Sequence, residues 1–323
     1  MQLLIPFASG LSDAAAQVLR DLTLPNLTQL MARLAPVPLD ATEAQADADT
    51  LSPPHERALA ALAGWHGADG CLPFAAQAAA KDGIDVGDAA WGLITPSHWH
   101  VGAHHVTLAD PAALELTEAE SRAAFDAVRD LFESEGIRFV WGATMRWYAA
   151  HGDLDGLPCA SLDRVIGRDV ERWMRGSAAR SAAQRRIRRL QSELQLLLYP
   201  HPLNDEREHR GALTLNSFWL SGCGRRQPDA STPPQVNATL RAPLLSDDWA
   251  AWADAWRALD AGDLAALLGE LRADRPVALT LCGERHAQRF ERGAAVTTGP
   301  RALWQTLAAH WKRVEPHTLL EAL

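Results

Sequence analysis

The stretch His201-Pro-Leu-Asn204-Asp-Glu-Arg207-Glu-His-Arg-Gly211 is followed closely by Thr214-Leu-Asn216-Ser-Phe-Trp219-Leu-Ser-Gly222-Cys-Gly224. The apolar run at 213–220 predicts a buried strand, and the Gly-x-Gly after it predicts a turn at the edge of an α/β sheet, where ligands commonly bind. His201, Asn204 and Arg207 recur every three residues, so on one helical turn they would share a face. An imidazole, an amide and a guanidinium together predict an anion-binding group.

This stretch resembles the archaeal-type, cofactor-independent phosphoglycerate mutases of the alkaline phosphatase superfamily. Those chains carry His-Pro-x-Asn-x-x-Arg-x-x-Gly before Ala-Asn-x-Ile-Trp-x-Trp-Gly-x-Gly, and Asn216, Trp219, Gly222 and Gly224 fall in register with the second motif. Residues 162–168 and 23–30 are similar, in the same order, to the family's Pro-His-Asp-Ile-x-Gly-Lys and Thr-Pro-Asn-Leu-Asp-x-Leu-Ala segments. The chain also resembles a divergent group of uncharacterised proteobacterial proteins regarded as mutase-like or regulatory.

The distribution of predicted elements agrees with an α/β fold. Residues 3–7 predict a strand that turns into a helix capped by Ser12 or Asp13, and helices at 247–259 and 262–271 precede a buried strand at 277–281. The resemblance implies an alkaline-phosphatase-like core sheet flanked by helices, with an inserted α+β capping domain. We expect residues 1–54 and 206–323 to form the core and residues 55–205 to form the inserted substrate domain.

Composition narrows the partners and the location. The net charge of −9 argues against broad nucleic-acid binding, which depends on Lys and Arg neutralising phosphates. No apolar stretch reaches membrane-spanning length, and the start of the chain lacks the basic residues of a signal peptide. The four cysteines form no Cys-x-x-Cys pair, which is typical of reduced thiols. We therefore expect a cytoplasmic protein whose partner is a small phosphorylated or carboxylated metabolite.

The resemblance also implies where a two-metal centre would lie, and there the sequence departs from the family. The first metal loop of the superfamily reads Asp-Gly-x-Gly-Asp, whereas this chain has Ser9-Gly-Leu-Ser12-Asp13, so only Asp13 matches. The second reads Asp-His-x-Thr-Pro, whereas this chain has Cys282-Gly-Glu284-Arg-His286. A hydroxyl is a poorer ligand for a divalent ion than a carboxylate, so the resemblance implies an incomplete metal site.

A histidine cluster offers substitute ligands. His98, His100, His104 and His105 fall within eight residues, and on a strand His98 and His100 project from the same face. Imidazole groups arranged in this way bind zinc. The same pattern is also typical of rings packed beside a tryptophan on a half-buried strand, and an anion-binding role is a further alternative.

Three other positions have two interpretations each. Arg146 resembles an arginine of the family's capping domain that would hold a phosphate or carboxylate, or it is a surface side chain packed over Trp147. Asp163 and Arg164 lie in a loop-to-helix turn, where they either contact a ligand or cap the helix. Cys223 is either a nucleophile at an exposed turn or a small residue that lets the turn form.

We derive three alternative functions. The first is a degenerate phosphoglycerate mutase-like protein that binds its ligand without mutase turnover, through Arg146, His201, Asn204 and Arg207 with Asp163, Arg164 and Asn216. The second is an active phosphoglycerate mutase or phosphatase with Ser9 or Ser12 as the attacking hydroxyl. It would hold Mn, Mg or Zn through Asp13, Glu284, His286 and members of the histidine cluster. The third is a protein-interaction or regulatory module built on the Trp-rich C-terminal helices.

Overall fold

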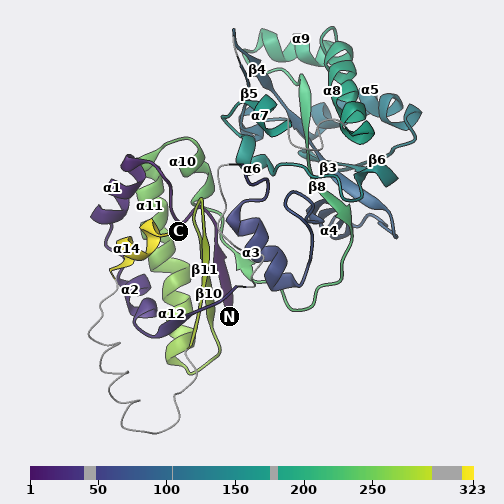
Figure 1. Cartoon of the computed structure of the whole chain (residues 1–323). Coiled ribbons are helices and arrows are strands. Elements are labelled where there is room, and N and C mark those ends of the chain that lie inside the picture. Colours follow the sequence, from purple (N-terminus) through teal and green to yellow (C-terminus); the bar gives the residue numbers. More distant parts are fainter. Residues whose placement is uncertain (40–48, 104, 175–180, 293–314) are drawn as a thin grey trace, which may run out of the picture. The chain divides into compact units, whose positions relative to one another are not determined.

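A computed structural model of the chain describes residues 1–39, 49–103, 105–174, 181–292 and 315–323, and its internal contacts divide it into two compact units (Figure 1). The first unit consists of Met1–Ala48, Pro53–Gly64 and Asp229–Leu323, and the second of Asp49–Ser52 and Trp65–Pro228. The chain therefore passes from one unit to the other four times. The predicted ligand His104 lies outside the described residues.

These limits differ from the predicted domain boundaries at both ends of the inserted part. Helix α3 (Pro54–Ala63) belongs to the first unit, and residues 206–228 belong to the second. The second difference arises because strand β8 (Ser217–Arg225) forms an antiparallel pair with β3 (Ala90–Ser97), within the second unit. Strand β8, the signature strand that carries the motif around Trp219 and Gly222, thus belongs to the sheet of the second unit and not to the sheet that contains β1.

The first unit is built on a five-stranded mixed sheet of order β2-β11-β10-β1-β9. Strand β1 runs parallel to β10 and β9, whereas β11 runs antiparallel to β10 and β2. Its strands are β1 (Gln2–Ile5), β2 (Leu34–Val37), β9 (Gln235–Val236), β10 (Ala278–Cys282) and β11 (Ala287–Arg292). The prediction of a mixed α/β arrangement is confirmed for this unit.

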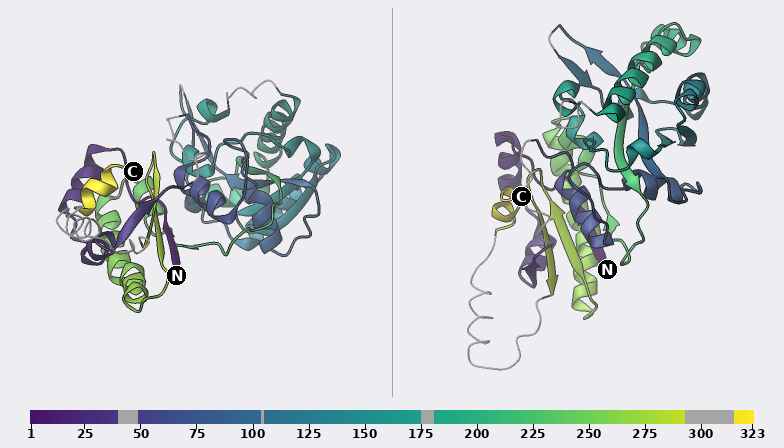
Figure 2. Two further views of the ribbon diagram at one scale, coloured as in Figure 1. Left: turned by 60° about the horizontal axis from the view of Figure 1, so that its bottom comes forward. Right: turned by 45° about the vertical axis from the view of Figure 1, so that its right-hand side comes forward.

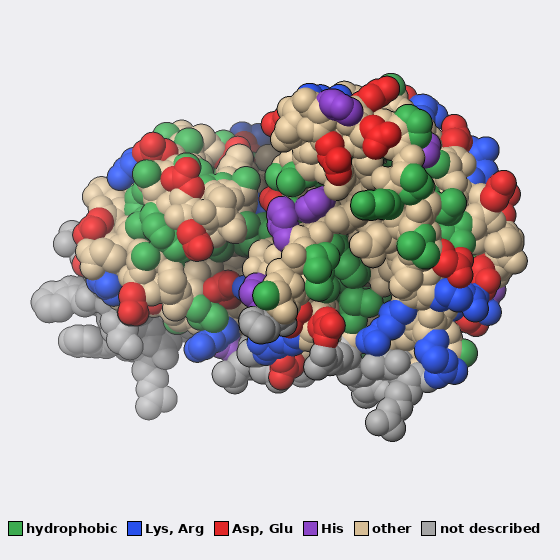
Figure 3. Space-filling view, turned by 90° about the horizontal axis from the view of Figure 1, so that it is seen from above, with side chains coloured by type: hydrophobic (Ala, Val, Ile, Leu, Met, Phe, Trp, Pro, Cys, Tyr) green, Lys and Arg blue, Asp and Glu red, His purple; other side chains and the backbone are tan. Residues whose placement is uncertain are grey.

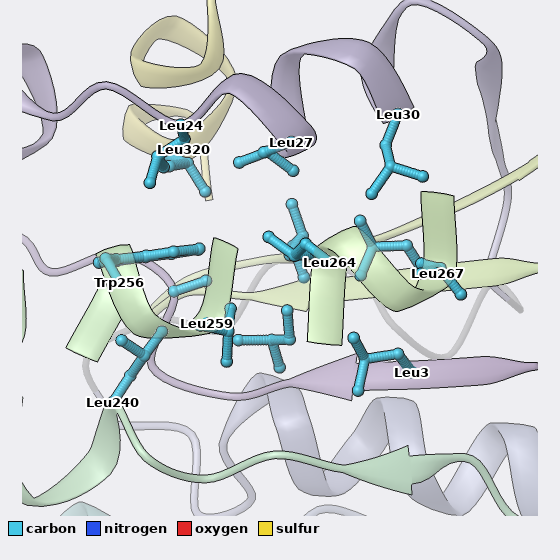
Figure 4. Close-up of a cluster of buried hydrophobic side chains, with 14 of the residues drawn as sticks. Leu3, Leu24, Leu27, Leu30, Leu240, Trp256, Leu259, Leu264, Leu267 and Leu320 are labelled. Atoms are coloured by element: carbon cyan, nitrogen blue, oxygen red, sulfur yellow. The ribbon is translucent and has the colours of Figure 1, made fainter. Parts of the chain in front are cut away.

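Helices cover both faces of this sheet (Figure 2). Side chains alternate along β1, so Leu3 and Ile5 enter the main hydrophobic cluster while Leu4 packs with Ala58 of α3 on the other face. Figure 4 shows the main cluster, in which leucines from several helices surround Trp256. The helices on this side are α1 (Asp13–Asp21), α2 (Pro25–Met31), α10 (Arg241–Leu245), α11 (Trp249–Leu259), α12 (Ala265–Arg272) and α14 (Pro316–Glu321).

A buried carboxylate joins two of these helical segments. Asp260 begins a π-helical turn (Asp260–Leu264) between α11 and α12, and only 3% of its surface is exposed. Its Oδ1 accepts a hydrogen bond from Leu27 N at 2.8 Å, and its Oδ2 accepts one from Asn26 N at 3.2 Å. These N–H groups lie in the first turn of α2, where no intrahelical acceptor exists, so Asp260 caps α2 from a distant part of the sequence.

The second unit has a four-stranded antiparallel sheet of order β6-β7-β3-β8, with β6 at Arg138–Ala143 and β7 at Arg146–Ala150. Trp147 and Ala149 of β7 face a cluster formed with α5 and α8, and Tyr148 and Ala150 face α4. A two-stranded hairpin joins β4 (Trp99–Val101) to β5 (Val106–Leu108). The helices and short turns are α4 (Phe74–Lys81), η2 (Pro111–Leu114), α5 (Glu118–Ser134), η3 (Gly152–Leu154), α6 (Leu162–Val165), α7 (Val170–Met174), α8 (Ala182–Leu198) and α9 (Pro202–His209).

The signature strand differs from its prediction in one respect. The two glycines expected to form a turn lie inside β8, where the register with β3 shifts next to Gly222. Gly222 has a left-handed φ of 63°, and a Cβ there would lie 2.9 Å from Ala75 N of α4. The residue therefore permits both a β-bulge and the close approach of a helix, and it does not end the strand.

Local predictions at the start of the chain are confirmed. Ser12 caps α1, because its Oγ accepts a hydrogen bond from Ala15 N at 3.1 Å, and Asp13 is the first residue of that helix. No helix in the described part of the chain is long and apolar enough to cross a membrane.

We expect Asp260→Ala to lower the free energy of unfolding by about 3 kcal/mol, because it leaves buried N–H groups of α2 without acceptors. Asp260→Asn should cost less, since one carbonyl oxygen remains. Urea-induced unfolding measures both, with Asp254→Ala on the exposed face of α11 as the matched control. A cost for Asp260→Ala no larger than that of the control would contradict the capping role.

Candidate functional site

The carboxyl ends of β1 and β10 meet at one edge of the first unit's sheet. The two strands are parallel neighbours, so the loops that follow them, 6–12 and 283–286, leave the sheet on the same side. Ala8 N donates to Cys282 O at 2.9 Å, and Leu11 N donates to Glu284 Oε2 at 2.8 Å. The two loops that the resemblance pairs as a metal site are therefore in direct contact.

Phe7 holds the first of these loops in a strained conformation. Its φ of 59° is left-handed, which for a bulky side chain costs about 1–3 kcal/mol and is concentrated at functional sites. Its ring lies 5.0 Å from that of His55, and its carbonyl accepts a hydrogen bond from Trp252 Nε1 at 3.3 Å. The surrounding packing thus fixes a turn that the sequence alone would disfavour.

The residues at this edge do not fit a two-metal centre. Asp13 is exposed in the first turn of α1, and Ser9, which stands where a carboxylate is expected, is 2% exposed and offers only a hydroxyl. Glu284 already accepts the Leu11 N–H. Within the described residues, no group of three or more His, Cys, Asp or Glu side chains lies close enough together to hold a metal ion. We derive no chemical step through a metal.

The loop after β10, residues 283–286, is hydrogen-bonded to Leu323 through its backbone. Arg285 N and His286 N both donate to Leu323 O, at 3.0 and 2.5 Å. A Cβ on Gly283 would lie 2.6 Å from the Leu323 carbonyl carbon, so only glycine allows this approach. The N–H groups of Gly283, Arg285 and His286 are therefore used within the protein, and the side chains of Arg285 and His286 are exposed or partly exposed.

The predicted anion-binding residues Asn204 and Arg207 are buried and hydrogen-bonded within the second unit. Arg207 is fully buried, and its guanidinium donates to Glu120 Oε1 at 2.7 Å, to Leu213 O at 2.7 Å and to Leu114 O. Asn204, 3% exposed, donates to the carbonyls of Leu198 and Leu215 and accepts from Leu215 N.

His201 caps α9, and its Nδ1 accepts from Leu203 N at 3.2 Å. The helical spacing of His201, Asn204 and Arg207 was predicted correctly, but their polar atoms bind other parts of the protein.

The guanidinium of Arg146 is also hydrogen-bonded within the protein. Its guanidinium makes a two-pronged contact with Asp82, Nε to Oδ2 and Nη2 to Oδ1, each at 2.9 Å, and Tyr148 donates to the same carboxylate at 2.7 Å. The hydrogen bond from Arg146 lowers the pKa of Asp82, and burial raises the pKa of Tyr148. These contacts complete a small ion-pair network on β7, and neither of the two interpretations of Arg146 included Asp82.

The remaining predicted ligand residues, Asp163, Arg164 and Asn216, also lie in the second unit and have structural contacts there. Asp163 and Arg164 lie in α6, where Ser161 is the N-cap and Arg164 is 7% exposed. Asn216 clamps the backbone of Trp99, accepting from its N–H at 2.7 Å and donating to its carbonyl at 3.0 Å. Asn216 thereby fixes the hairpin formed by β4 and β5.

The histidine cluster contains one close pair. The rings of His98 and His100 lie 4.5 Å apart, and His98 Nδ1 lies 2.7 Å from Thr214 O, to which it must donate because a carbonyl only accepts. Burial lowers the pKa of His98, which keeps the ring neutral. A metal role for these histidines stays a prediction.

Cys223 is fully buried beside Cys159, with the two sulfur atoms 3.7 Å apart, and this hydrogen bond and burial raise its thiol pKa. A protonated, buried thiol is a poor nucleophile, so the packing interpretation of Cys223 is favoured.

The structure thus groups Ser9, Ser12, Asp13, Glu284 and His286 in the first unit and places the other described candidates in the second. Sequence reasoning missed Phe7, Asp82 and Glu120, because each acts through partners that are distant in the sequence. On the face drawn in Figure 3, acidic and basic side chains are interspersed.

Comparisons with known proteins give weak similarities. No protein-family model matches the chain, and no curated protein matches it. Among solved structures, the cofactor-independent phosphoglycerate mutase from Thermoplasma acidophilum DSM 1728 is 13% identical over 99% of both chains, with a TM-score of 0.36. The PH0037 protein from Pyrococcus horikoshii is 13% identical over 98% of this chain and 97% of that chain, with a TM-score of 0.46. Similarities this low carry no conclusion about activity.

The Glu120 network should make stability depend on pH. Burial would raise the pKa of Glu120, but hydrogen bonds from Thr117, Arg210 and Arg207 lower it from 4.5 to about 2. The ionised carboxylate therefore contributes stability, on the order of 2 kcal/mol, that is complete above pH 4.5 and is lost as the pH falls toward 2.

Urea unfolding of the wild type and Glu120→Gln across this range tests the expectation. The difference in unfolding free energy should be large at pH 6 and should shrink toward pH 2. Glu118→Gln, an exposed neighbour on α5, is the control. A difference that stays constant with pH would contradict the assignment.

Proposed function

We propose that this protein is a phosphoglycerate mutase-like protein that binds a small phosphorylated or carboxylated ligand at the carboxyl edge of the first unit's sheet, without mutase turnover. The observation that carries the proposal is the left-handed Phe7 directly after β1, at the edge where the loops after β1 and β10 touch. A strained turn at the carboxyl end of parallel strands is typical of a ligand site.

The side chains at this edge suit an anion. Arg285 is exposed and His286 is partly exposed in the loop after β10. In the loop after β1 the hydroxyl of Ser12 is exposed, whereas Ser9 is buried. Helix α1, nine residues long, begins at the same edge and adds the positive end of its dipole. Two carboxylates lie among them: Asp13 is exposed in the first turn of α1, and Glu284 accepts the Leu11 N–H, which offsets part of its repulsion.

The absence of turnover is proposed from the same side chains. Phosphoryl transfer in the superfamily that the sequence resembles requires two metals held by several carboxylates and histidines. Here Ser9 replaces one carboxylate, Glu284 is hydrogen-bonded to backbone, and Asp13 sits on the first turn of a helix. The ligand would therefore be held and not converted.

We expect 3-phosphoglycerate, inorganic phosphate or malonate to raise the thermal unfolding temperature of the full chain, whereas neutral glycerol should not. At a ligand concentration of 100 times Kd, binding stabilises the folded state by about 2.7 kcal/mol. The double variant Arg285→Gln/His286→Gln should abolish the shift in unfolding temperature. The control variant Arg257→Gln, on the exposed face of α11, should retain it. No shift with any of the anions, or an equal shift in the double variant, would refute the proposed site.

Catalysis is tested separately. With Mn²⁺, Mg²⁺ or Zn²⁺ supplied, we expect no conversion of 3-phosphoglycerate to 2-phosphoglycerate above the buffer rate and no phosphate release. Turnover that disappears in Asp13→Asn would instead establish a metal-dependent phosphomutase or phosphatase.

A further inference from the structure

The second unit contains two adjoining hollows between α7, α8 and β8. The larger has a volume of about 370 Å³ and the smaller about 50 Å³, and Met174, Arg188 and Gln191 line both. The larger volume lies within the range of about 300–1,000 Å³ that is typical of small-molecule sites. All of the lining residues belong to the second unit, so this site is separate from the sheet edge proposed to bind anions.

Tryptophans line both hollows, Trp99 the larger one and Trp173 and Trp219 the smaller one. Trp219 of β8 is 3% exposed and is fixed by a hydrogen bond from its Nε1 to Ala160 O at 2.9 Å. Trp99 lies with its ring centroid 6.3 Å from that of Trp219, at an interplanar angle of 52°, and Asn216 holds its backbone. Trp173 lines the smaller hollow from α7. Flat apolar walls of this kind favour a planar aromatic ligand.

Several polar atoms of the wall have no hydrogen-bond partner among the described residues. Gln191 is 6% exposed, and its Nε2 donates to Phe218 O at 3.1 Å. In the described part of the chain its Oε1 accepts no hydrogen bond, and the indole Nε1 atoms of Trp99 and Trp173 donate none. Gln184 Oε1, in the wall of the smaller hollow, likewise accepts no hydrogen bond from the described residues. Buried polar groups are almost always paired, so these four groups require a partner with two donors and two acceptors.

The larger hollow is lined by one side chain of each charge. Arg188 lines both hollows and donates to Met174 O at 2.6 Å, and Glu171 lines only the larger one. The other lining residues are neutral. A ligand with a net charge would therefore gain little from the larger hollow.

We propose that the second unit binds a neutral, planar heteroaromatic ring that carries both hydrogen-bond donors and acceptors, such as a nucleobase. The ring packs against Trp99 in the larger hollow, because the smaller one, at about 50 Å³, is too small to hold it. It donates to Gln191 Oε1, on the border of both hollows, and accepts from the indole N–H groups of Trp99 and Trp173. The unpartnered atoms become paired only after small side-chain rotations, because they are buried before binding.

Calorimetric titration of the full chain with three probes tests this inference. Adenine carries donors and acceptors, indole carries one donor and no comparable acceptor, and adenosine monophosphate carries the base with a charged group attached. We expect adenine to bind at least tenfold more tightly than indole. Equal binding of adenosine monophosphate would indicate a nucleotide as the source of the base, and weaker binding would indicate the free base. No binding of adenine, or binding of indole as tight as that of adenine, would overturn the proposal.

Matched variants locate the binding. Trp99→Phe and Trp173→Phe each remove one unpaired indole N–H and keep an aromatic wall, so each should weaken adenine binding roughly 5- to 10-fold. The unliganded thermal stability should not fall through loss of a hydrogen bond, because that N–H has no partner among the residues that the structure describes. Trp249→Phe, the same change in the first unit, should leave adenine binding unchanged. An adenine affinity that neither pocket variant changes would refute the site.

Discussion

The parallel pairing of β1 with β10 is the constraint on which the rest of the architecture depends. It brings Gln2 beside Ala278 and Ile5 beside Leu281, so the sheet of the first unit forms only when two distant parts of the chain meet. The entropic cost of closing such a loop grows slowly with its length, so a whole folded unit can be inserted between the two strands. The same pairing brings together the two loops of the candidate site.

Local sequence patterns predicted the elements well, because their causes are local. Ser12 caps the helix expected after the first strand, and the apolar run at 277–281 became the central strand β10. The spacing of His201, Asn204 and Arg207 correctly predicted a helical turn. Their role could not be predicted, because Arg207 pairs with Glu120, 87 positions earlier in the sequence. Spacing shows which residues share a face of a helix, but not which residues from the rest of the chain contact that face.

The same limit explains the rest of the candidate site. The adjacency of the loops after β1 and β10 follows from the parallel pairing of these strands, and the resemblance implied it by assigning both loops to one metal centre. The left-handed backbone of Phe7 does not, because nothing in a phenylalanine indicates a positive φ. Polar residues that appeared functional have structural contacts around the segment that leads into β8: Asn204 and Arg207 bond to the carbonyls of Leu215 and Leu213, and Asn216 bonds to Trp99. Asn216 thereby positions a tryptophan of the larger hollow.

The four passages of the chain between the two units also determine the order in which the protein can fold as it is synthesised. Strand β1 leaves the ribosome long before β10, so it has no central partner while residues 65–228 emerge. The second unit is complete once β8 has joined β3, and domains generally fold as they emerge. An apolar strand of the first unit therefore has no partner in its sheet until the last third of the chain has been synthesised.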